Sequence, residues 1–281
     1  MANINYEDII KPPGRFVSIN WKELWHYRDL FLVLTWRDIA VRYKQTVLGV
    51  LWAIFQPLIT MVIFSFIFNR MAGIESGDNT PYPIFLYTGQ LFWLYYSNTL
   101  NLAANSMVMN AALVQKIYFP RLIIPATSVI TGLVDLAIAS VILAGMMIYY
   151  GFVPSFIGIL ILPVLLISTV LTSMGIGLYM ASLNIKYRDV RHALPFLIQS
   201  MMYVTPVIYP VKMLDGHPVI KTLMIWLNPI SGIITNARAG IIGNSPIDWN
   251  MLVISLFMSI VYFILGLYYF RNTERYFADI V

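Results

Sequence analysis

The sequence contains no cysteine and is short of charge. The absence of Cys among its 281 residues excludes disulfides, thiolate nucleophiles and metal sites built on cysteine. Asp, Glu, Lys and Arg make up 11% of the chain, whereas soluble domains usually carry about 25%. Hydrophobic residues reach 59%. Since so few charges cannot cover a water-facing surface of this size, we expect most of the surface to face lipid.

Motifs for catalysis and nucleotide binding are also missing. No GxxxxGK[S/T] loop occurs, so any ATP site must lie on another subunit, and no H-E-x-x-H pattern points to zinc. The three histidines, His26, His192 and His217, are far apart in the sequence. The apolar runs offer no paired carboxylates for acid–base chemistry. We therefore expect no catalytic residues, no metal and no cofactor in this chain. We also expect no nucleic acid partner, because no basic patch lies on a soluble module.

Long apolar runs dominate what is present. A transmembrane helix needs roughly 20 mostly apolar residues. Six runs qualify, at about 48–69, 83–104, 122–150, 155–183, 193–210 and 250–270. No signal peptide is visible, so we expect the first run to insert and to remain. The sequence thus predicts an all-α integral membrane protein with six transmembrane helices.

The placement of Lys and Arg predicts the orientation. If the N-terminus is cytoplasmic, fourteen Lys and Arg lie on inner segments and four on outer segments. The positive-inside rule then places both termini in the cytoplasm. We divide the chain into a cytoplasmic leader and interfacial helix (1–46), a six-span membrane domain (47–271) and a cytoplasmic tail (272–281).

The segment between the fifth and sixth runs is unusual. It contains two apolar pieces, VIKTLMIWL and ISGIITNARAGIIG, separated by Asn228 and Pro229. Each piece is too apolar for an ordinary loop and too short to span. Paired re-entrant helices that dip into the outer leaflet and return fit both properties. A pair of additional spans is the alternative.

The approach to the first run has an amphipathic pattern. Eight apolar residues fall on one stripe of a helix: Trp21, Leu24, Trp25, Phe31, Leu32, Trp36, Ile39 and Tyr43. This pattern is typical of a helix that lies in the membrane interface. The helix could simply anchor the chain to anionic lipid. Alternatively, Arg42, Tyr43 and Lys44 line the cytoplasmic mouth of a path and bind an anionic headgroup. A pyrophosphate suits this site, because several donors can share its oxygens.

Two further features carry predictions. A short cytoplasmic helix is expected over Met107 to Tyr118, stopped by Pro120, and it packs either on a partner or on its own bundle. Asp135 is the one ionisable residue well inside an apolar run, and such a residue is suspected of function. A single carboxylate does not make an ion relay. We therefore favour a structural role, with Asp135 hydrogen-bonded near Thr131 and Ser128.

Five segments of the chain together resemble a known family. In order they are RDIAVRYKQTVLGVLWAIFQP, KIYFPRLIIP, NIKYRDVRHALP, TPVIY and WLNPISGIITNARAGIIG. They look like the membrane subunits of type-2 ABC exporters of lipid-linked polysaccharides, especially the O-antigen of lipopolysaccharide. The resemblance covers nearly the whole chain from about Tyr27. Exporters of teichoic acid and capsular polysaccharide share parts of the pattern and are alternatives for the cargo.

The resemblance implies partners and site residues. It implies a homodimer in the bacterial inner membrane, with two ATPase subunits that hold ATP and Mg. The cargo would be a polysaccharide linked to undecaprenyl pyrophosphate, with surrounding membrane lipids. The helix of about Trp21 to Lys44 would gate the entrance, with Arg42, Tyr43 and Lys44 at the pyrophosphate. The glycan path would be lined by Trp52, Trp93, Tyr95, Tyr96 and Tyr203. Coupling to the ATPase would use Met107, Leu113, Val114, Lys116, Ile117, Tyr118 and Arg121.

Three other classes of function remain open at this point. They are an ion-coupled flippase for a lipid-linked sugar, a membrane enzyme that modifies glycans, and a passive scaffold. An exporter of the family above would differ from each of them by its dependence on a partner ATPase.

Overall fold

The computed structural model describes residues 21–44, 49–187 and 189–274, and this part of the chain contains helices and no strand. The predicted all-α fold is therefore confirmed. Residues 1–20 of the predicted leader, residues 45–48 and the tail from residue 275 lie outside the described residues. The helices are α1 (Trp21–His26), α2 (Arg28–Lys44), α3 (Gly49–Phe64), α4 (Tyr82–Met109), α5 (Ala111–Lys116), α6 (Ile123–Tyr150), α7 (Phe156–Lys186), α8 (Val190–Val204), α9 (Pro218–Leu227), α10 (Pro229–Ile242) and α11 (Trp249–Thr273).

Not all six predicted spans meet the length and hydropathy of a membrane helix. Among the described residues, four segments do so: α3 with its π-helical continuation to Met71, α6, α7 and α11. A fifth is reached if α9 and α10 count as one broken span. Helix α4 is long enough at 28 residues but too polar, and α8 has only 15 residues. The structure therefore supports a membrane protein with four or five such segments.

Helix α7 lies at the centre of the bundle. It packs against α4, α10 and α11, while α4 also packs on α6. Two glycine pairs allow the closest of these approaches. A Cβ at Gly266 of α11 would lie 1.8 Å from the carbonyl oxygen of Gly175 in α7. A Cβ at Gly158 of α7 would lie 2.1 Å from the carbonyl oxygen of Gly240 in α10. Backbone contact of this kind needs small residues, as in other membrane helix pairs.

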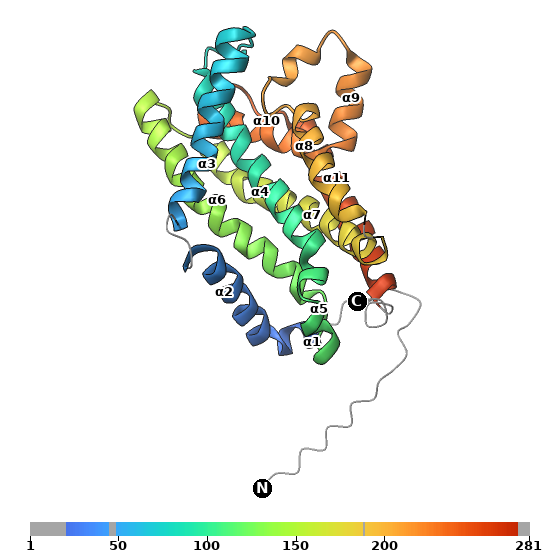
Figure 1. Cartoon of the computed structure of the whole chain (residues 1–281). Coiled ribbons are helices and arrows are strands. Elements are labelled where there is room, and N and C mark those ends of the chain that lie inside the picture. Colours follow the sequence, from blue (N-terminus) through green and yellow to red (C-terminus); the bar gives the residue numbers. More distant parts are fainter. Residues whose placement is uncertain (1–20, 45–48, 188, 275–281) are drawn as a thin grey trace.

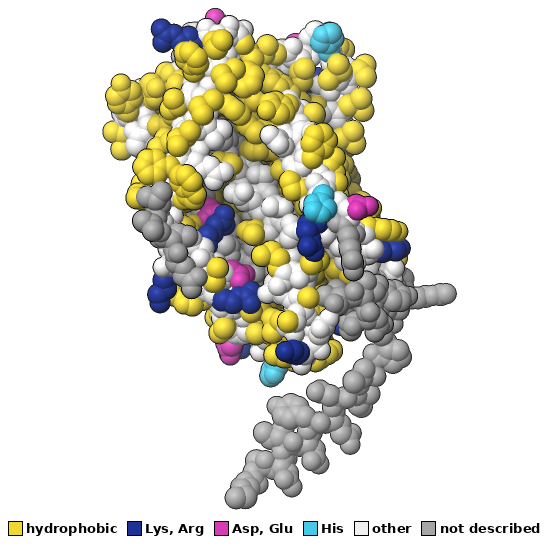
Figure 2. All heavy atoms as spheres, in the orientation of Figure 1, with side chains coloured by type: hydrophobic (Ala, Val, Ile, Leu, Met, Phe, Trp, Pro, Cys, Tyr) yellow, Lys and Arg dark blue, Asp and Glu magenta, His cyan; other side chains and the backbone are white. Residues whose placement is uncertain are grey.

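The outer surface of the helices is apolar. Many large hydrophobic side chains are exposed on the spans, among them Val62, Ile148, Leu160 and Val253. Figure 2 shows such side chains covering the upper part of one face, whereas most Lys and Arg gather in its lower half. A band of exposed apolar side chains is what a lipid environment favours.

The two ends of the bundle carry different elements (Figure 1). Helices α1, α2 and α5 lie at one end, and α9 lies at the other. The Tyr27 hydroxyl donates to the Tyr118 carbonyl at 3.4 Å, and Arg121 donates to the carbonyl of Glu274 after α11. The turn between α1 and α2 and the residue after α11 therefore both contact the loop between α5 and α6.

The predicted interfacial helix differs in two respects. It is interrupted at Tyr27, which separates α1 from α2. The residues of its apolar stripe are partly exposed and partly buried against the protein. Trp21, Trp25 and Trp36 are more than 70% exposed, whereas Phe31 packs beside the buried Leu34 in a cluster at this end of the bundle. The exposed tryptophans thus form the face that is available to lipid, and the adjacent face holds α2 on the protein.

The segment between α8 and α11 contains the short 3-10 helix Val211–Leu214 and the two short helices α9 and α10. The predicted return of α9 and α10 to the outer leaflet stays a prediction. Helices α9 and α10 bend by 96° at their break. With 10 and 14 residues, neither is long enough to span alone, which argues against the alternative of two additional spans. Helix α10 is buried over almost its whole length, whereas only Met224 of α9 is buried.

Candidate functional site

Two neighbouring residues at the end of α2 converge on one carboxylate of α6. Arg42 Nη1 lies 2.7 Å from Asp135 Oδ2, and the Tyr43 hydroxyl donates a hydrogen bond to Asp135 Oδ1. The Asp135 side chain is 16% exposed and that of Arg42 is 37% exposed. Burial, and then the adjacent Asp135 carboxylate, raise the pKa of the Tyr43 phenol above its ordinary value. Tyr43 therefore stays protonated and remains a donor.

The local hydrogen-bond partners predicted for Asp135 are wrong. Thr131 donates to the carbonyl of Thr127 at 3.0 Å, and Ser128 donates to the carbonyl of Pro125. Hydroxyl side chains in helices often bond backwards in this way to the preceding turn. Asp135 consequently points to α2, where its partners lie 92 and 93 residues earlier in the chain.

Asp135, Arg42 and Tyr43 border a cavity of about 130 Å³. The cavity lies between α2, α3, α4 and α6, and its polar and aromatic lining residues are Arg42, Tyr43, Trp52, Gln56, Tyr95, Asn98 and Asp135. The structure thus brings two of the predicted entrance residues together with Trp52 and Tyr95 of the predicted glycan path.

The other predicted path and entrance residues do not line this cavity. Lys44 is exposed at the end of α2. Trp93 and Tyr96 are buried in α4, and their rings contact each other at a tilt of 52° with centroids 5.3 Å apart. Tyr203 is 54% exposed on α8. The glycan path through these residues stays a prediction.

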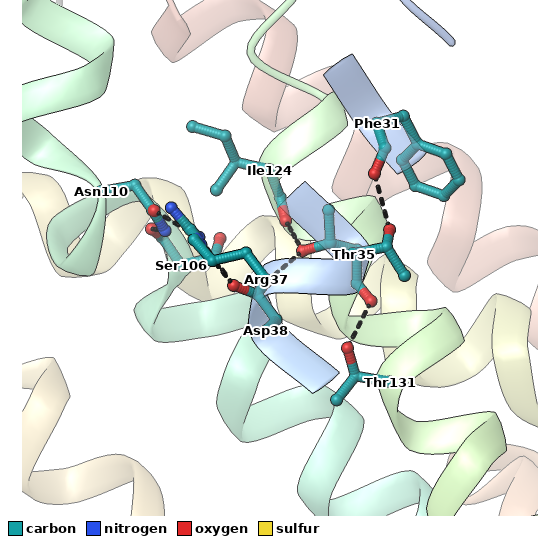
Figure 3. A network of polar contacts seen from close by, with 9 residues as sticks. Phe31, Thr35, Arg37, Asp38, Ser106, Asn110, Ile124 and Thr131 are labelled. Carbon is teal, nitrogen blue, oxygen red and sulfur yellow. Dashed lines mark hydrogen bonds and ion pairs between the residues drawn. The ribbon is translucent and has the colours of Figure 1, made fainter. Parts of the chain in front are cut away.

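A polar network holds α2 on the bundle (Figure 3). Thr127 of α6 donates to Asp38 Oδ2 at 3.0 Å, and Arg37 pairs with Asp38 Oδ1 at 2.7 Å. Arg37 also donates to Asn110 Oδ1 at 2.9 Å, next to α5. Sequence reasoning missed these contacts. The i, i+4 spacing of Asp38 and Arg42 could have indicated that α2 presents polar side chains to the bundle, because this spacing places both side chains on one face of the helix.

The predicted coupling helix has different bounds. Helix α4 continues to Met109, α5 covers only Ala111–Lys116, and Ile117 is already extended. The prediction of one helix from Met107 to Tyr118 is therefore wrong. Met107 is fully buried in the last turn of α4, because its side chain joins the apolar cluster that contains Leu34 and Val114.

The predicted coupling residues divide into buried and exposed ones. Val114 is buried, and Leu113 and Arg121 are half-buried. Lys116 is exposed, Ile117 is 55% exposed and Tyr118 is 83% exposed. An exposed apolar and aromatic pair at the tip of a loop is a typical contact surface for another protein.

Comparison with known proteins decides the family. The family model described as ABC-2 type transporter matches residues 29–242, which is most of the chain. The chain belongs to the ABC-2 type transporter family. The family and the several apolar helices make it a multi-pass membrane protein of the bacterial inner membrane.

Relatives of this ABC-2 transporter have informative names. The chain is 30% identical to the O-antigen export system permease protein RfbA of Klebsiella pneumoniae, over 94% of this chain and 100% of that protein. It is 26% identical to the protein of the same name from Myxococcus xanthus, over 78% of this chain and 82% of that one. It is also 23% identical to the polysialic acid transport protein KpsM of Escherichia coli, over 85% and 91% of the two chains.

This ABC-2 transporter has a second, larger cavity at its other end. Its volume is about 800 Å³, and it lies among α9, α10, the start of α11 and the loops beside them. The ion pairs Lys212–Asp78 and Lys221–Asp215 stand at its border. Arg238 of α10 also contributes to its wall. Sequence reasoning gave no indication of this cavity, since its residues come from three separate stretches of the chain, 76–85, 210–221 and 235–251.

Proposed function

We propose that the chain is the membrane subunit of an ABC exporter that moves O-antigen polysaccharide, linked to undecaprenyl pyrophosphate, across the inner membrane. The family match and the full-length relatives named as O-antigen export permeases support this function. The chain itself is not catalytic, and a separate ATPase subunit supplies ATP hydrolysis.

The observation that carries the proposal is the cavity between α2 and α6. It combines a cation, a phenol and aromatic rings where the end of α2 and the start of α3 meet the middle of α4 and α6. Arg42 would bind the pyrophosphate with Lys44 beside it as a second cation, and Tyr43 would join them by transferring its hydrogen bond from Asp135 to the headgroup. Trp52 and Tyr95 offer ring faces on which the first sugars can stack.

The assembly in this proposal is a homodimer of six-span subunits with two ATPases. In it, α4 and α8 act as the second and fifth spans. The polar α4 is tolerated because protein surrounds most of its length. Helices α9 and α10 form the re-entrant pair on the periplasmic side, and both termini are cytoplasmic. ATP binding closes the ATPases, α5 and the exposed loop after it transmit the motion, and the channel between the subunits opens.

A capsular polysaccharide exporter is the second candidate. The polysialic acid transport protein supports it, although its identity to this chain is lower at 23%. Both functions use the same architecture, and they differ in the polysaccharide that is carried.

The proposed entrance is tested by the double change Arg42→Ala and Lys44→Ala. We expect loss of surface polysaccharide while the amount of protein in the membrane is unchanged, because the anionic headgroup loses both cations. Surface polysaccharide is measured by immunoblotting of whole cells. The matched control is Lys22→Ala with Lys186→Ala, which removes two other exposed cations. Unaltered display in the first variant contradicts the entrance.

A further inference from the structure

The larger cavity, at the end of the bundle that carries α9, has an unusually polar lining. Its volume of about 800 Å³ lies within the range of about 300–1,000 Å³ that is typical of ligand pockets. Such pockets are lined mainly by apolar side chains, whereas more than half of the residues around this cavity are polar or charged. A lining of this kind suits a ligand with many hydroxyl groups better than it suits an acyl chain.

The charged side chains around the cavity balance one another. Three cations and three acids line it: Lys212, Lys221, Arg238, Asp78, Asp215 and Asp248. Arg238 is buried and donates to three backbone carbonyls, and Asp248 accepts a hydrogen bond from the N–H of Met251 in α11. An anion therefore meets no excess of positive charge, and recognition depends on hydrogen bonds to neutral groups.

Several hydrogen-bonding groups at the cavity stay open. Asp78 and Asp215 each use Oδ1 in an ion pair with a lysine, whereas Oδ2 of each accepts no hydrogen bond from the residues that the structure describes. The exposed amide of Asn250 likewise makes no hydrogen bond to the described part of the chain. A hydroxyl group both donates and accepts, so it can pair with the carboxylate oxygens as well as with the amide.

An aromatic ring borders the same cavity. Trp249, the first residue of α11, lines it and is 56% exposed. The apolar face of a sugar ring, with its C–H groups, packs well on an aromatic face. Tryptophans also anchor helices at the membrane interface. Trp226 of α9 offers a comparison for that role, because it is 45% exposed and does not line the cavity.

We propose that this cavity is a carbohydrate-binding site within a single subunit, which holds a short stretch of the polysaccharide where it leaves the membrane. Trp249 provides the stacking surface, while Asp78, Asp215 and Asn250 bind hydroxyl groups. The role in export rests on the proposed function, in which this end of the bundle faces the periplasm. A polymer that is held here is hindered from sliding back between two cycles of the ATPase.

Binding of a lipid-free polysaccharide tests the proposal, because this probe lacks the pyrophosphate that the entrance would bind. O-polysaccharide is released by mild acid from the lipopolysaccharide of the cell that makes the exporter. Its binding to the complex with its ATPase is measured by isothermal titration calorimetry in nanodiscs, which keep sugar-headed detergents away from the cavity. We expect an affinity that changes by less than about twofold between about 50 and about 500 mM NaCl, since contacts to neutral hydroxyl groups are little screened.

The variants separate stacking on the ring from membrane anchoring. Trp249→Leu should weaken binding by about tenfold, because leucine keeps an apolar residue at the start of α11 but removes the ring. Trp249→Phe should retain most of the affinity, and Trp226→Leu is the matched control that should leave it unchanged. Asn250→Ala should weaken binding by about threefold, and it serves alone if Trp249→Leu does not yield a stable complex.

Three results would overturn the site: no binding to the unmodified complex, binding that neither Trp249→Leu nor Asn250→Ala weakens, or binding that is lost with salt. ATP-dependent export of the same polysaccharide is measured in parallel. Export without binding of the lipid-free chain rejects this site alone, whereas absence of export refutes the proposed function, so the two failures can be told apart.

Discussion

At the scale of single residues, Arg238 shows how this protein accommodates a buried cation. Its Nε, Nη1 and Nη2 donate to the carbonyls of Phe85, Pro206 and Val207 at 2.9, 2.7 and 2.5 Å. Its guanidinium also lies 3.6 Å from the centroid of the Phe85 ring. Gly89 gives the space, since a Cβ there would lie 2.3 Å from Nη2. Through its hydrogen bonds to three backbone carbonyls, the Arg238 side chain links α10 to α4 and to the chain after α8.

Replacing Arg238 by Met should therefore destabilise the fold strongly. We expect a loss of about 3 kcal/mol in the free energy of unfolding, because the carbonyls lose their shared donor in a buried place. Thermal unfolding of the purified protein in detergent measures this loss. Lys212→Met is the control, because the Lys212 side chain is 64% exposed and surface ion pairs contribute about 0–1 kcal/mol. Equal effects of the two changes would contradict the structural role of Arg238.

At the scale of helices, the two glycine pairs on α7 set the helix spacing. Gly158 and Gly175 face Gly240 of α10 and Gly266 of α11 respectively. Each pair places backbone against backbone, which leaves no room for a methyl group. Gly145 of α6, in contrast, is exposed and has nothing within 4 Å of the position of a Cβ.

The comparison of Gly266→Ala with Gly145→Ala isolates this effect. Alanine is favoured over glycine by about 1 kcal/mol in a helix, so Gly145→Ala should be neutral or stabilising. Gly266→Ala should lower the melting temperature, since α11 must move away from α7. Differential scanning fluorimetry in detergent measures both. Similar melting temperatures for the two variants would show that the close contact is not needed.

The loop after α5 yields a second prediction at this scale. Ile117→Ala with Tyr118→Ala should reduce co-purification of the ATPase subunit by about tenfold or more, because exposed aromatic anchors dominate many protein interfaces. The control is Ile148→Ala with Tyr149→Ala, an adjacent pair of the same residue types that is 83% and 82% exposed at the other end of α6. Undiminished recovery of the ATPase with the first variant would reject the coupling role.

The sequence predicted the apolar helices better than the polar contacts. The run at 122–150 corresponds to α6 within one residue, because its hydropathy changes sharply at Pro120–Arg121 and at Gly151. The predicted run ends at residue 104, whereas α4 continues to Met109. Asn105 therefore lies within the helix, and its side-chain oxygen accepts a hydrogen bond from Asn184 of α7 at 3.0 Å. The partner of Asp135 could not be found locally either. Both contacts join residues about 80 or more positions apart, which a helical pattern does not reveal.

At the scale of the whole molecule, the chain has two chemically different ends. One end carries α1, α2 and α5, with the cavity of Arg42 and Asp135 where the end of α2 meets α3, α4 and α6, and the other end contains α9, α10 and the larger cavity. Relatives named as O-antigen export permeases match this chain over nearly their entire length. A conduit that admits a lipid-linked polysaccharide at one end and releases it at the other accounts for both ends.

The central claim is tested most directly by transport in a purified system. The chain and its ATPase are reconstituted in proteoliposomes with lipid-linked O-antigen, and the polysaccharide that becomes accessible to a membrane-impermeant glycosidase is measured. We predict movement that requires ATP and is lost with Arg42→Ala and Lys44→Ala. Equal movement without nucleotide, or movement driven by an ion gradient, would contradict the account.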